Sequence, residues 1–124
     1  MKGEEDLLNF YQHSTCTSCR KGRQWLENNS IEYQVIDMIA TPPSKEQLME
    51  WMTVSDLPIS RFFNGKGNRY RELNLKETVP EMTMEEAAEL LSTDGMLIKR
   101  PLVTDGEKST LGFKEEDFEK EWVK

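Results

Sequence analysis

The sequence predicts an α/β fold in which helices flank a mixed four-stranded sheet and an all-helical insertion interrupts the chain. Three observations predict it. The first 38 residues show a strand, helix and strand pattern, residues 44–93 show helical periodicity, and two short strands and a helix follow residue 100. Two strands joined through a helix lie parallel with a right-handed crossover. The expected order is therefore β-α-β, insertion, β-β-α.

The first strand is predicted at residues 7–12, LLNFYQ, which form an apolar and aromatic run. A helix is expected over 17–28, with Trp25 and Leu26 as its apolar anchors. Residues 31–38, IEYQVIDM, alternate apolar and polar side chains, which is typical of a half-buried strand.

The insertion begins with a capping-box spacing, Ser44 and Gln47, which predicts the start of a helix. The spacing of apolar side chains predicts another short helix at 56–63, and the residues Asn-Gly-Lys-Gly-Asn at 64–68 predict a turn or mobile loop.

A further helix is predicted from Thr83 to Leu91, because Thr83 and Glu86 form a second capping-box pattern. Residues 79–82 are its expected lead-in. Gly95 follows the end of this helix, where glycine is common.

The last third of the chain predicts a β-hairpin followed by a helix. Residues 101–104 and 109–113 are the expected strands, with a turn at Asp105-Gly106. Phe118 and Trp122, four residues apart, mark the apolar face of the final helix.

Length and charge restrict the class of protein. We expect 124 residues to form one domain, 1–124, because no linker or repeat divides them. The net charge of −7 argues against direct nucleic-acid binding, which needs Lys and Arg to neutralise phosphates. No apolar run approaches the roughly 18–20 residues that span a bilayer, and Glu4, Glu5 and Asp6 stand where a signal peptide is basic. The expected location is therefore cytoplasmic, without a membrane partner.

Cys16 and Cys19 are the candidate catalytic residues, and they lie where the first strand passes into the first helix. Backbone N–H groups and the helix dipole favour a thiolate at a helix N-terminus, and Arg20, Lys21 and Arg23 add positive charge. Cys16 is nearer the helix start and is the expected nucleophile, able to attack a disulfide, a peroxide or an oxyanion. Cys19 is the expected resolving cysteine.

Less reactive interpretations of these residues remain open. A C-x-x-C pair is also half of a zinc site, but two cysteines and one histidine fall short of four ligands, so no metal is expected. The two cysteines can also be inert. His13 is either a packing residue or a group that tunes Cys16.

A second candidate site is Lys99-Arg100-Pro101 at the entry to the third strand. Proline is tolerated at the first residue of a strand, and X-Pro bonds can be cis. A cis proline facing the redox helix leaves the neighbouring backbone free to pair with an incoming substrate chain. Arg100 is either an anion-binding residue or an ordinary solvated charge.

Three segments together resemble the glutaredoxin-coupled arsenate reductase and Spx-like family of the thioredoxin-like superfamily: YQHSTCTSCRKGRQWLENNSIEY, YRELNL and TDGMLIKRPLVTDGEKSTLGF. The resemblance implies a thioredoxin-like sheet, Cys16 as the nucleophile, Arg100 as an anion-binding residue and a cis Pro101. It implies a small oxyanion or a protein disulfide as substrate, with glutathione and glutaredoxin, or thioredoxin, as reductant. No tightly bound cofactor is expected.

The sequence departs from the arsenate-reducing branch at two positions. That branch holds the oxyanion with two further arginines, which align with Asn64 and with Phe113 or Lys114. Each lost charge-assisted hydrogen bond costs roughly 1.5–3 kcal/mol of oxyanion binding.

The C-T-S-C pair with Arg20, a further anion-binding candidate, resembles the Spx branch instead. Spx proteins are redox-switched regulators that bind the C-terminal domain of the RNA polymerase alpha subunit. The segments YRELNL and TDGMLIKRP resemble a group of arsenate-reductase-like proteins with a C-x-x-C motif. We therefore expect a thiol-dependent oxidoreductase, with the redox-switched regulator as the alternative.

Overall fold

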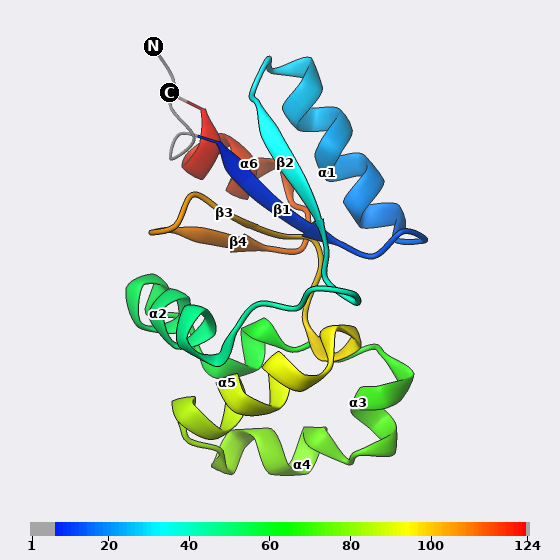
Figure 1. Cartoon of the computed structure of the whole chain (residues 1–124), viewed down its shortest axis with the longest axis vertical. Coiled ribbons are helices and arrows are strands. Elements are labelled where there is room, and N and C mark those ends of the chain that lie inside the picture. Colours follow the sequence, from blue (N-terminus) through cyan, green and yellow to red (C-terminus); the bar gives the residue numbers. More distant parts are fainter. Residues whose placement is uncertain (1–6, 124) are drawn as a thin grey trace. The chain divides into compact units, whose positions relative to one another are not determined.

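The computed structural model describes residues 7–123. The acidic residues on which the expected absence of a signal peptide depends lie outside this range. The chain forms two compact units (Figure 1). We call them the sheet unit, which draws on Met1–Asp37 and Arg100–Lys124, and the helical unit, Met38–Lys99. The prediction of a single domain stays a prediction.

The sheet unit contains the predicted mixed four-stranded sheet. Its strands are β1 (Leu8–Gln12), β2 (Tyr33–Asp37), β3 (Leu102–Thr104) and β4 (Ser109–Leu111). They lie in the order β2-β1-β3-β4. The β1–β2 pair is parallel, and the β1–β3 and β3–β4 pairs are antiparallel. The predicted fold class is therefore confirmed, with β2 and β4 shorter than expected.

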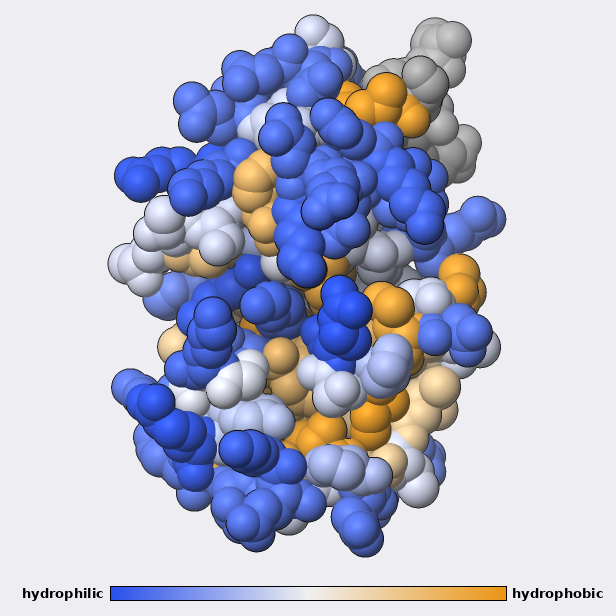
Figure 2. Space-filling model, turned by 180° about the vertical axis from the view of Figure 1, so that it is seen from behind, coloured by the Kyte–Doolittle hydropathy of each residue, from blue (hydrophilic) through white to orange (hydrophobic). Residues whose placement is uncertain are grey.

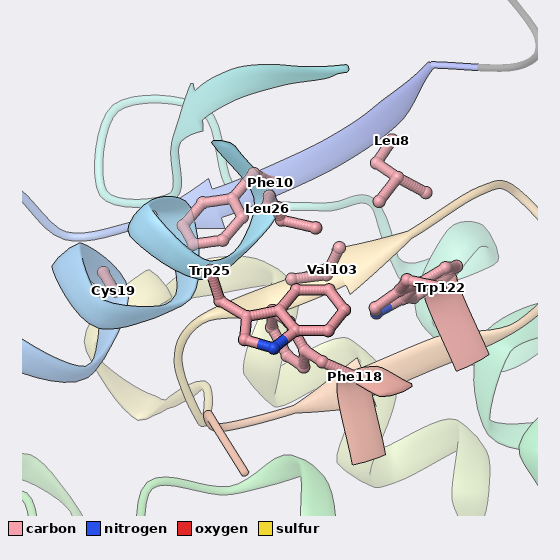
Figure 3. Close-up of a cluster of buried hydrophobic side chains, with 8 residues drawn as sticks. All are labelled: Leu8, Phe10, Cys19, Trp25, Leu26, Val103, Phe118 and Trp122. Atoms are coloured by element: carbon pink, nitrogen blue, oxygen red, sulfur yellow. The ribbon is translucent and has the colours of Figure 1, made fainter. Parts of the chain in front are cut away.

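Helices α1 (Thr17–Asn28) and α6 (Glu115–Trp122) pack against one face of this sheet. Phe10 of β1 is paired with Val103 of β3, so both side chains point to the same face. Figure 3 shows these side chains meeting residues of the two helices. The cluster comprises Leu8, Phe10, Cys19, Trp25, Leu26, Val103, Phe118 and Trp122.

The close approach of α1 to β1 depends on Gly22. A Cβ atom at Gly22 would lie 3.2 Å from the ring of Phe10, which is tighter than ordinary van der Waals contact. The helix interior accepts a residue of low helix propensity here because a larger one would push α1 away from the sheet.

The helical unit contains both predicted capped helices, α2 (Lys45–Ser55) and α5 (Met84–Thr93). Ser44 and Thr83 are their N-caps, and each forms the complete capping box that the sequence predicts. The amphipathic pattern is thus reinforced by hydrogen bonds at the first turn.

The rest of this unit differs from the prediction. The helix expected over 56–63 is a 3₁₀ turn, η2 (Ile59–Phe62), and the lead-in at 79–82 is a second one, η3 (Val79–Glu81). Two short helices were missed, α3 (Asn68–Glu72) and α4 (Leu75–Thr78). Helices of four or five residues are too short to show a hydrophobic period.

Gly95 follows the end of α5, as the sequence predicts, and it also allows a close backbone approach. It begins the 3₁₀ turn η4 (Gly95–Leu97), and a Cβ atom there would lie 1.9 Å from the carbonyl oxygen of Met38. Glycine is required at this position because of the close backbone approach.

Most of the face drawn in Figure 2 is hydrophilic, with apolar residues in small groups. This agrees with the 31% of charged residues in the sequence. Within residues 7–123, none of the helices combines the length and the apolar character needed to cross a membrane.

Candidate functional site

Cys16 is the N-cap of α1, and its sulfur takes the part of a capping side chain. Its backbone is extended, with φ −84° and ψ 117°, and its Sγ accepts a hydrogen bond from the Cys19 N–H at 3.2 Å. Its own N–H donates to the carbonyl of His13 at 3.1 Å. The sulfur therefore lies where a helix N-terminus presents unpaired N–H groups, as the sequence predicts.

Cys19 lies one turn into α1 and is fully buried, with an exposed fraction of 0%. Burial, followed by a hydrogen bond to Cys16, raises the pKa of the Cys19 thiol from 9.0 to about 12. A backbone hydrogen bond with His13 and the charge of Arg100 lower the same pKa. Their effect is smaller than the increase caused by burial and by Cys16. At neutral pH the Cys19 thiol is therefore protonated.

The two cysteines differ in their access to solvent. Cys16 is half-buried and packs against the edge of the apolar cluster, whereas Cys19 lies within it (Figure 3). Both are free thiols, and the backbone N–H of Cys19 donates to the Cys16 sulfur at 3.2 Å. One sulfur is thus partly exposed, and the other is buried one helical turn away.

Arg100 lies just before β3, which begins at Leu102. The Arg100–Pro101 peptide bond is cis, as the resemblance implied. Positive charge on Arg100 acts on Cys19, and its Nη1 atom is buried without a hydrogen-bond partner in the described part of the chain. Buried donors without acceptors are rare, so this one is a candidate to bind an anion or an oxygen atom.

The three predicted cations, Arg20, Lys21 and Arg23, all lie on α1. Arg20 and Lys21 are exposed, and Arg23 donates a hydrogen bond to Oε1 of Gln12 at the end of β1. The charge that acts on Cys19 from outside the helix is that of Arg100. The role of Arg20 in anion binding stays a prediction.

His13 is half-buried, and its Nδ1 lies 3.0 Å from Oγ1 of Thr15. Its backbone supports the cysteine loop through the carbonyl that accepts from Cys16. In residues 7–123, no three His, Cys, Asp or Glu side chains are grouped so that they could bind a metal ion.

The positions that align with the two further arginines of the arsenate-reducing branch hold Asn64 and Phe113 or Lys114. Asn64 lies in the helical unit, where its N–H donates to the carbonyl of Leu97 at 2.7 Å. In the sheet unit, the Phe113 ring meets the Phe118 ring at 4.9 Å and packs against the apolar cluster. Lys114 is exposed at the N-cap of α6.

Two features of the site were not predicted from the sequence. They are the capping of α1 by the Cys16 sulfur and the buried Arg100 Nη1 atom, which has no hydrogen-bond partner in residues 7–123. The predicted helix start at residue 17 already placed Cys16 at the N-cap, but cysteine is not among the usual capping residues. Burial of the Arg100 Nη1 atom has no local signal, because burial depends on segments distant in the sequence.

The sheet order, the dithiol at the start of α1 and the cis proline before β3 define a thioredoxin-like protein. The ArsC family model matches residues 11–121. The chain belongs to the ArsC family.

Three curated relatives illustrate the range of similar proteins. The uncharacterized protein YusI of Bacillus subtilis is 51% identical over 94% of this chain and 98% of its own length. The regulatory protein MgsR of the same species is 31% identical over 88% of this chain and 85% of its own. The global transcriptional regulator Spx of Streptococcus pyogenes is 23% identical over 90% and 82%.

Two solved structures show the same fold. An ArsC-family-related protein of Bacteroides fragilis is 42% identical, with a TM-score of 0.86 over 91% of this chain and 95% of that one. A protein of Streptococcus mutans described as a possible arsenate reductase is 36% identical, with a TM-score of 0.85 over 92% and 98%.

Proposed function

We propose that this protein is a cytoplasmic, thiol-dependent oxidoreductase of the arsenate-reductase-like type, with Cys16 as nucleophile and Cys19 as resolving cysteine. The observation that supports the proposal is that the two sulfurs differ in burial. Cys16 is half-buried at the N-terminus of α1, and Cys19 is fully buried, protonated and hydrogen-bonded to it.

The reaction follows from this difference in burial. The Cys16 thiolate attacks one sulfur of a substrate disulfide, forms a mixed disulfide and releases the other sulfur as a thiolate. The Cys19 thiol gives its proton to that leaving thiolate and attacks the Cys16 sulfur. This attack breaks the mixed disulfide and releases the second substrate sulfur as a thiolate, which takes a proton from solvent. The products are two substrate thiols and a Cys16–Cys19 disulfide, which glutathione with glutaredoxin, or thioredoxin, reduces.

An oxyanion is the other substrate that the family relationship supports. Cys16 would attack its central atom, one oxygen of the oxyanion would leave as water after taking protons from solvent, and Arg100 Nη1 would donate a hydrogen bond to a remaining oxygen.

The test is to trap the mixed disulfide. Cys19→Ser, incubated with glutathione disulfide, should accumulate one glutathione on Cys16, detected by mass spectrometry of the intact protein. Cys16→Ser should accumulate none, because Cys19 is buried and protonated. If Cys16→Ser is modified as fast as Cys19→Ser, the assignment of the two roles is wrong.

A redox-switched regulator is the second candidate. Its support is the similarity to MgsR and Spx, together with the C-T-S-C pair followed by Arg20. In that case the output is a protein surface, and the expected partner is the C-terminal domain of the RNA polymerase alpha subunit. Binding of that domain should change between the reduced and the oxidised protein, without catalytic turnover.

A further inference from the structure

Asn64 and Gly65 begin a tight turn in the helical unit, and the two residues are held unequally. The N–H of Asn64 donates to the carbonyl of Leu97 at 2.7 Å, and the Asn64 carbonyl accepts from the N–H of Gly67 at 3.1 Å. The N–H of Gly65 has no hydrogen-bond partner among residues 7–123. A Cβ atom at Gly65 would meet no atom within 4 Å. The backbone is therefore fixed at Asn64, and the peptide nitrogen that follows it is free to react.

The side-chain amide of Asn64 is also unrestrained. Neither its Oδ1 nor its Nδ2 has a hydrogen-bond partner in the part of the chain that the structure describes. A Cβ atom at Gly67 would lie 3.0 Å from Nδ2, so the amide lies over its own turn. Asn64 is half-buried and Gly65 is exposed. Closure of a bond between the Gly65 nitrogen and Cγ of Asn64 makes a five-membered ring, so the two atoms are within reach of each other.

Glycine follows Asn or Asp at two other places, Asp94-Gly95 and Asp105-Gly106, and both are restrained. The N–H of Gly106 donates to Oγ1 of Thr104 at 3.0 Å, and Oδ1 of Asp105 accepts from two backbone N–H groups. Both carboxylate oxygens of Asp94 accept hydrogen bonds, and Gly95 is buried. Ring closure at either place requires breaking these contacts. The fold leaves the pair at Asn64 unrestrained.

The charge around the turn favours removal of the Gly65 proton. Residues 61–71 carry four exposed cations and no acid. They are Arg61, Lys66, Arg69 and Arg71. Arg69 is paired with two carboxylates, whereas the other three form no ion pair within residues 7–123. Positive charge stabilises an anionic nitrogen and the anionic intermediate of its attack, although water and salt weaken the effect at exposed positions.

We propose that Asn64 is a site of spontaneous deamidation, by which the folded protein slowly converts this side chain to a carboxylate. The co-reactant is water, and the products are aspartate and isoaspartate at residue 64. The inference is independent of the proposed function, because it uses neither cysteine. The new carboxylate lies at a position that aligns with an arginine of the arsenate-reducing branch. Deamidation therefore places a negative charge where that branch holds a positive one.

The atoms balance in two steps, and no electrons are transferred between molecules. The Gly65 nitrogen loses its proton to solvent and attacks Cγ of Asn64. The bond between Cγ and Nδ2 breaks, and Nδ2 takes a proton from solvent and leaves as ammonia. Water then opens the resulting succinimide ring. Attack at Cγ gives aspartate, and attack at the main-chain carbonyl carbon gives isoaspartate, in which the chain continues through Cγ.

The experiment follows residue 64 in the folded, full-length protein during incubation at neutral and mildly alkaline pH. Trypsin releases residues 62–66, Phe-Phe-Asn-Gly-Lys, in which Asn64 is the single amide side chain. Mass spectrometry of this peptide measures conversion of the amide to an acid, and chromatography separates aspartate from isoaspartate. A sample digested at time zero corrects for conversion during digestion. The rate should rise with pH, because the Gly65 nitrogen must lose its proton before it attacks.

Two other asparagines and the unfolded chain supply reference rates. The side-chain amides of Asn29 and Asn74 donate hydrogen bonds to Trp25 and Glu77. Conversion at Asn64 should be at least about tenfold faster than at either, the factor for one hydrogen bond of ordinary strength. It should also stay within about tenfold of its rate in urea, because an unrestrained turn needs little opening.

Gly65→Ala is the matched variant, because its Cβ has open space and its φ lies outside the left-handed region. The alanine restricts the backbone and hinders attack, so conversion should slow at least about threefold. Asn64→Gln should show no conversion over the same time, because its attack requires a six-membered ring. Circular dichroism checks that both variants are folded.

Three results would each overturn the inference. The first is conversion at Asn64 no faster than at Asn29 and Asn74. The second is conversion in urea that the folded protein suppresses by much more than tenfold. The third is an equal rate in a folded Gly65→Ala. None of them bears on the mixed disulfide of Cys16, so failure of this inference and failure of the proposed function are distinguishable.

Discussion

The backbone N–H of Cys19 donates a hydrogen bond to the sulfur of Cys16 at 3.2 Å, so the candidate nucleophile is also the N-cap of α1. The sulfur proposed to react is therefore also a group that stabilises the helix. Substitutions at residue 16 can separate these two contributions, because serine is a good capping residue and alanine is not.

Cys16→Ala should lower the free energy of unfolding by about 1 kcal/mol relative to Cys16→Ser. Both variants lack the nucleophile, so the difference reports the cap alone. Urea denaturation of the two variants under reducing conditions measures it. Equal midpoints and slopes would show that the side chain at residue 16 does not cap α1.

The buried Cys19 thiol should make the protein less stable at alkaline pH. Its pKa is raised from 9.0 to about 12 in the folded protein, chiefly by burial. Above pH 9 the unfolded chain therefore releases this proton while the folded protein keeps it. The unfolded state is favoured as pH rises, so this contribution to stability is present below pH 9 and is lost between pH 9 and 12.

Denaturation of the wild type and Cys19→Ala at several pH values from 8 to about 10.5 tests this linkage. The free energy of unfolding should fall more steeply with pH in the wild type, by at most about 1.4 kcal/mol per pH unit for one proton. Parallel curves would contradict the raised pKa, whatever the vertical offset that the lost side chain produces.

Gly95→Ala should destabilise the protein by about 1–3 kcal/mol or more, because its Cβ would lie 1.9 Å from the Met38 carbonyl oxygen and the backbone must move. Gly65→Ala is the matched control, since its Cβ meets no atom within 4 Å. Thermal or urea unfolding of both variants gives the comparison. Similar losses in both would show that the close approach at Gly95 is unimportant.

The buried hydrogen bond from Trp122 Nε1 to Thr110 Oγ1, 3.1 Å long, ties α6 to β4. Thr110→Val removes the acceptor and leaves the indole N–H unpaired, which should cost about 1–3 kcal/mol of stability. Trp122→Phe combined with Thr110→Val should lose less than the sum of the single losses, because the orphaned donor is gone. Full additivity in this double-mutant cycle would indicate that the bond contributes nothing.

Local sequence was sufficient to predict several elements of this fold. α1 begins and ends at the predicted residues, 17 and 28, and both capping boxes form. Hydrogen bonds within four residues and side-chain periodicity determine such features, so they are visible in a short window. The helices α3 and α4 were missed because each is too short to show a hydrophobic period; a left-handed residue, Asn74 with φ 56°, lies between them.

The sequence by itself determined the dithiol, its position at the start of a helix and the order of the elements around the sheet. Tertiary structure alone decided that Cys19 is fully buried, that the charge of Arg100 acts on it from the segment before β3, and that one guanidinium nitrogen lacks a partner among residues 7–123. The reason is physical. Capping depends on near neighbours in the chain, whereas burial and Coulomb interactions depend on distances through space between segments some eighty residues apart.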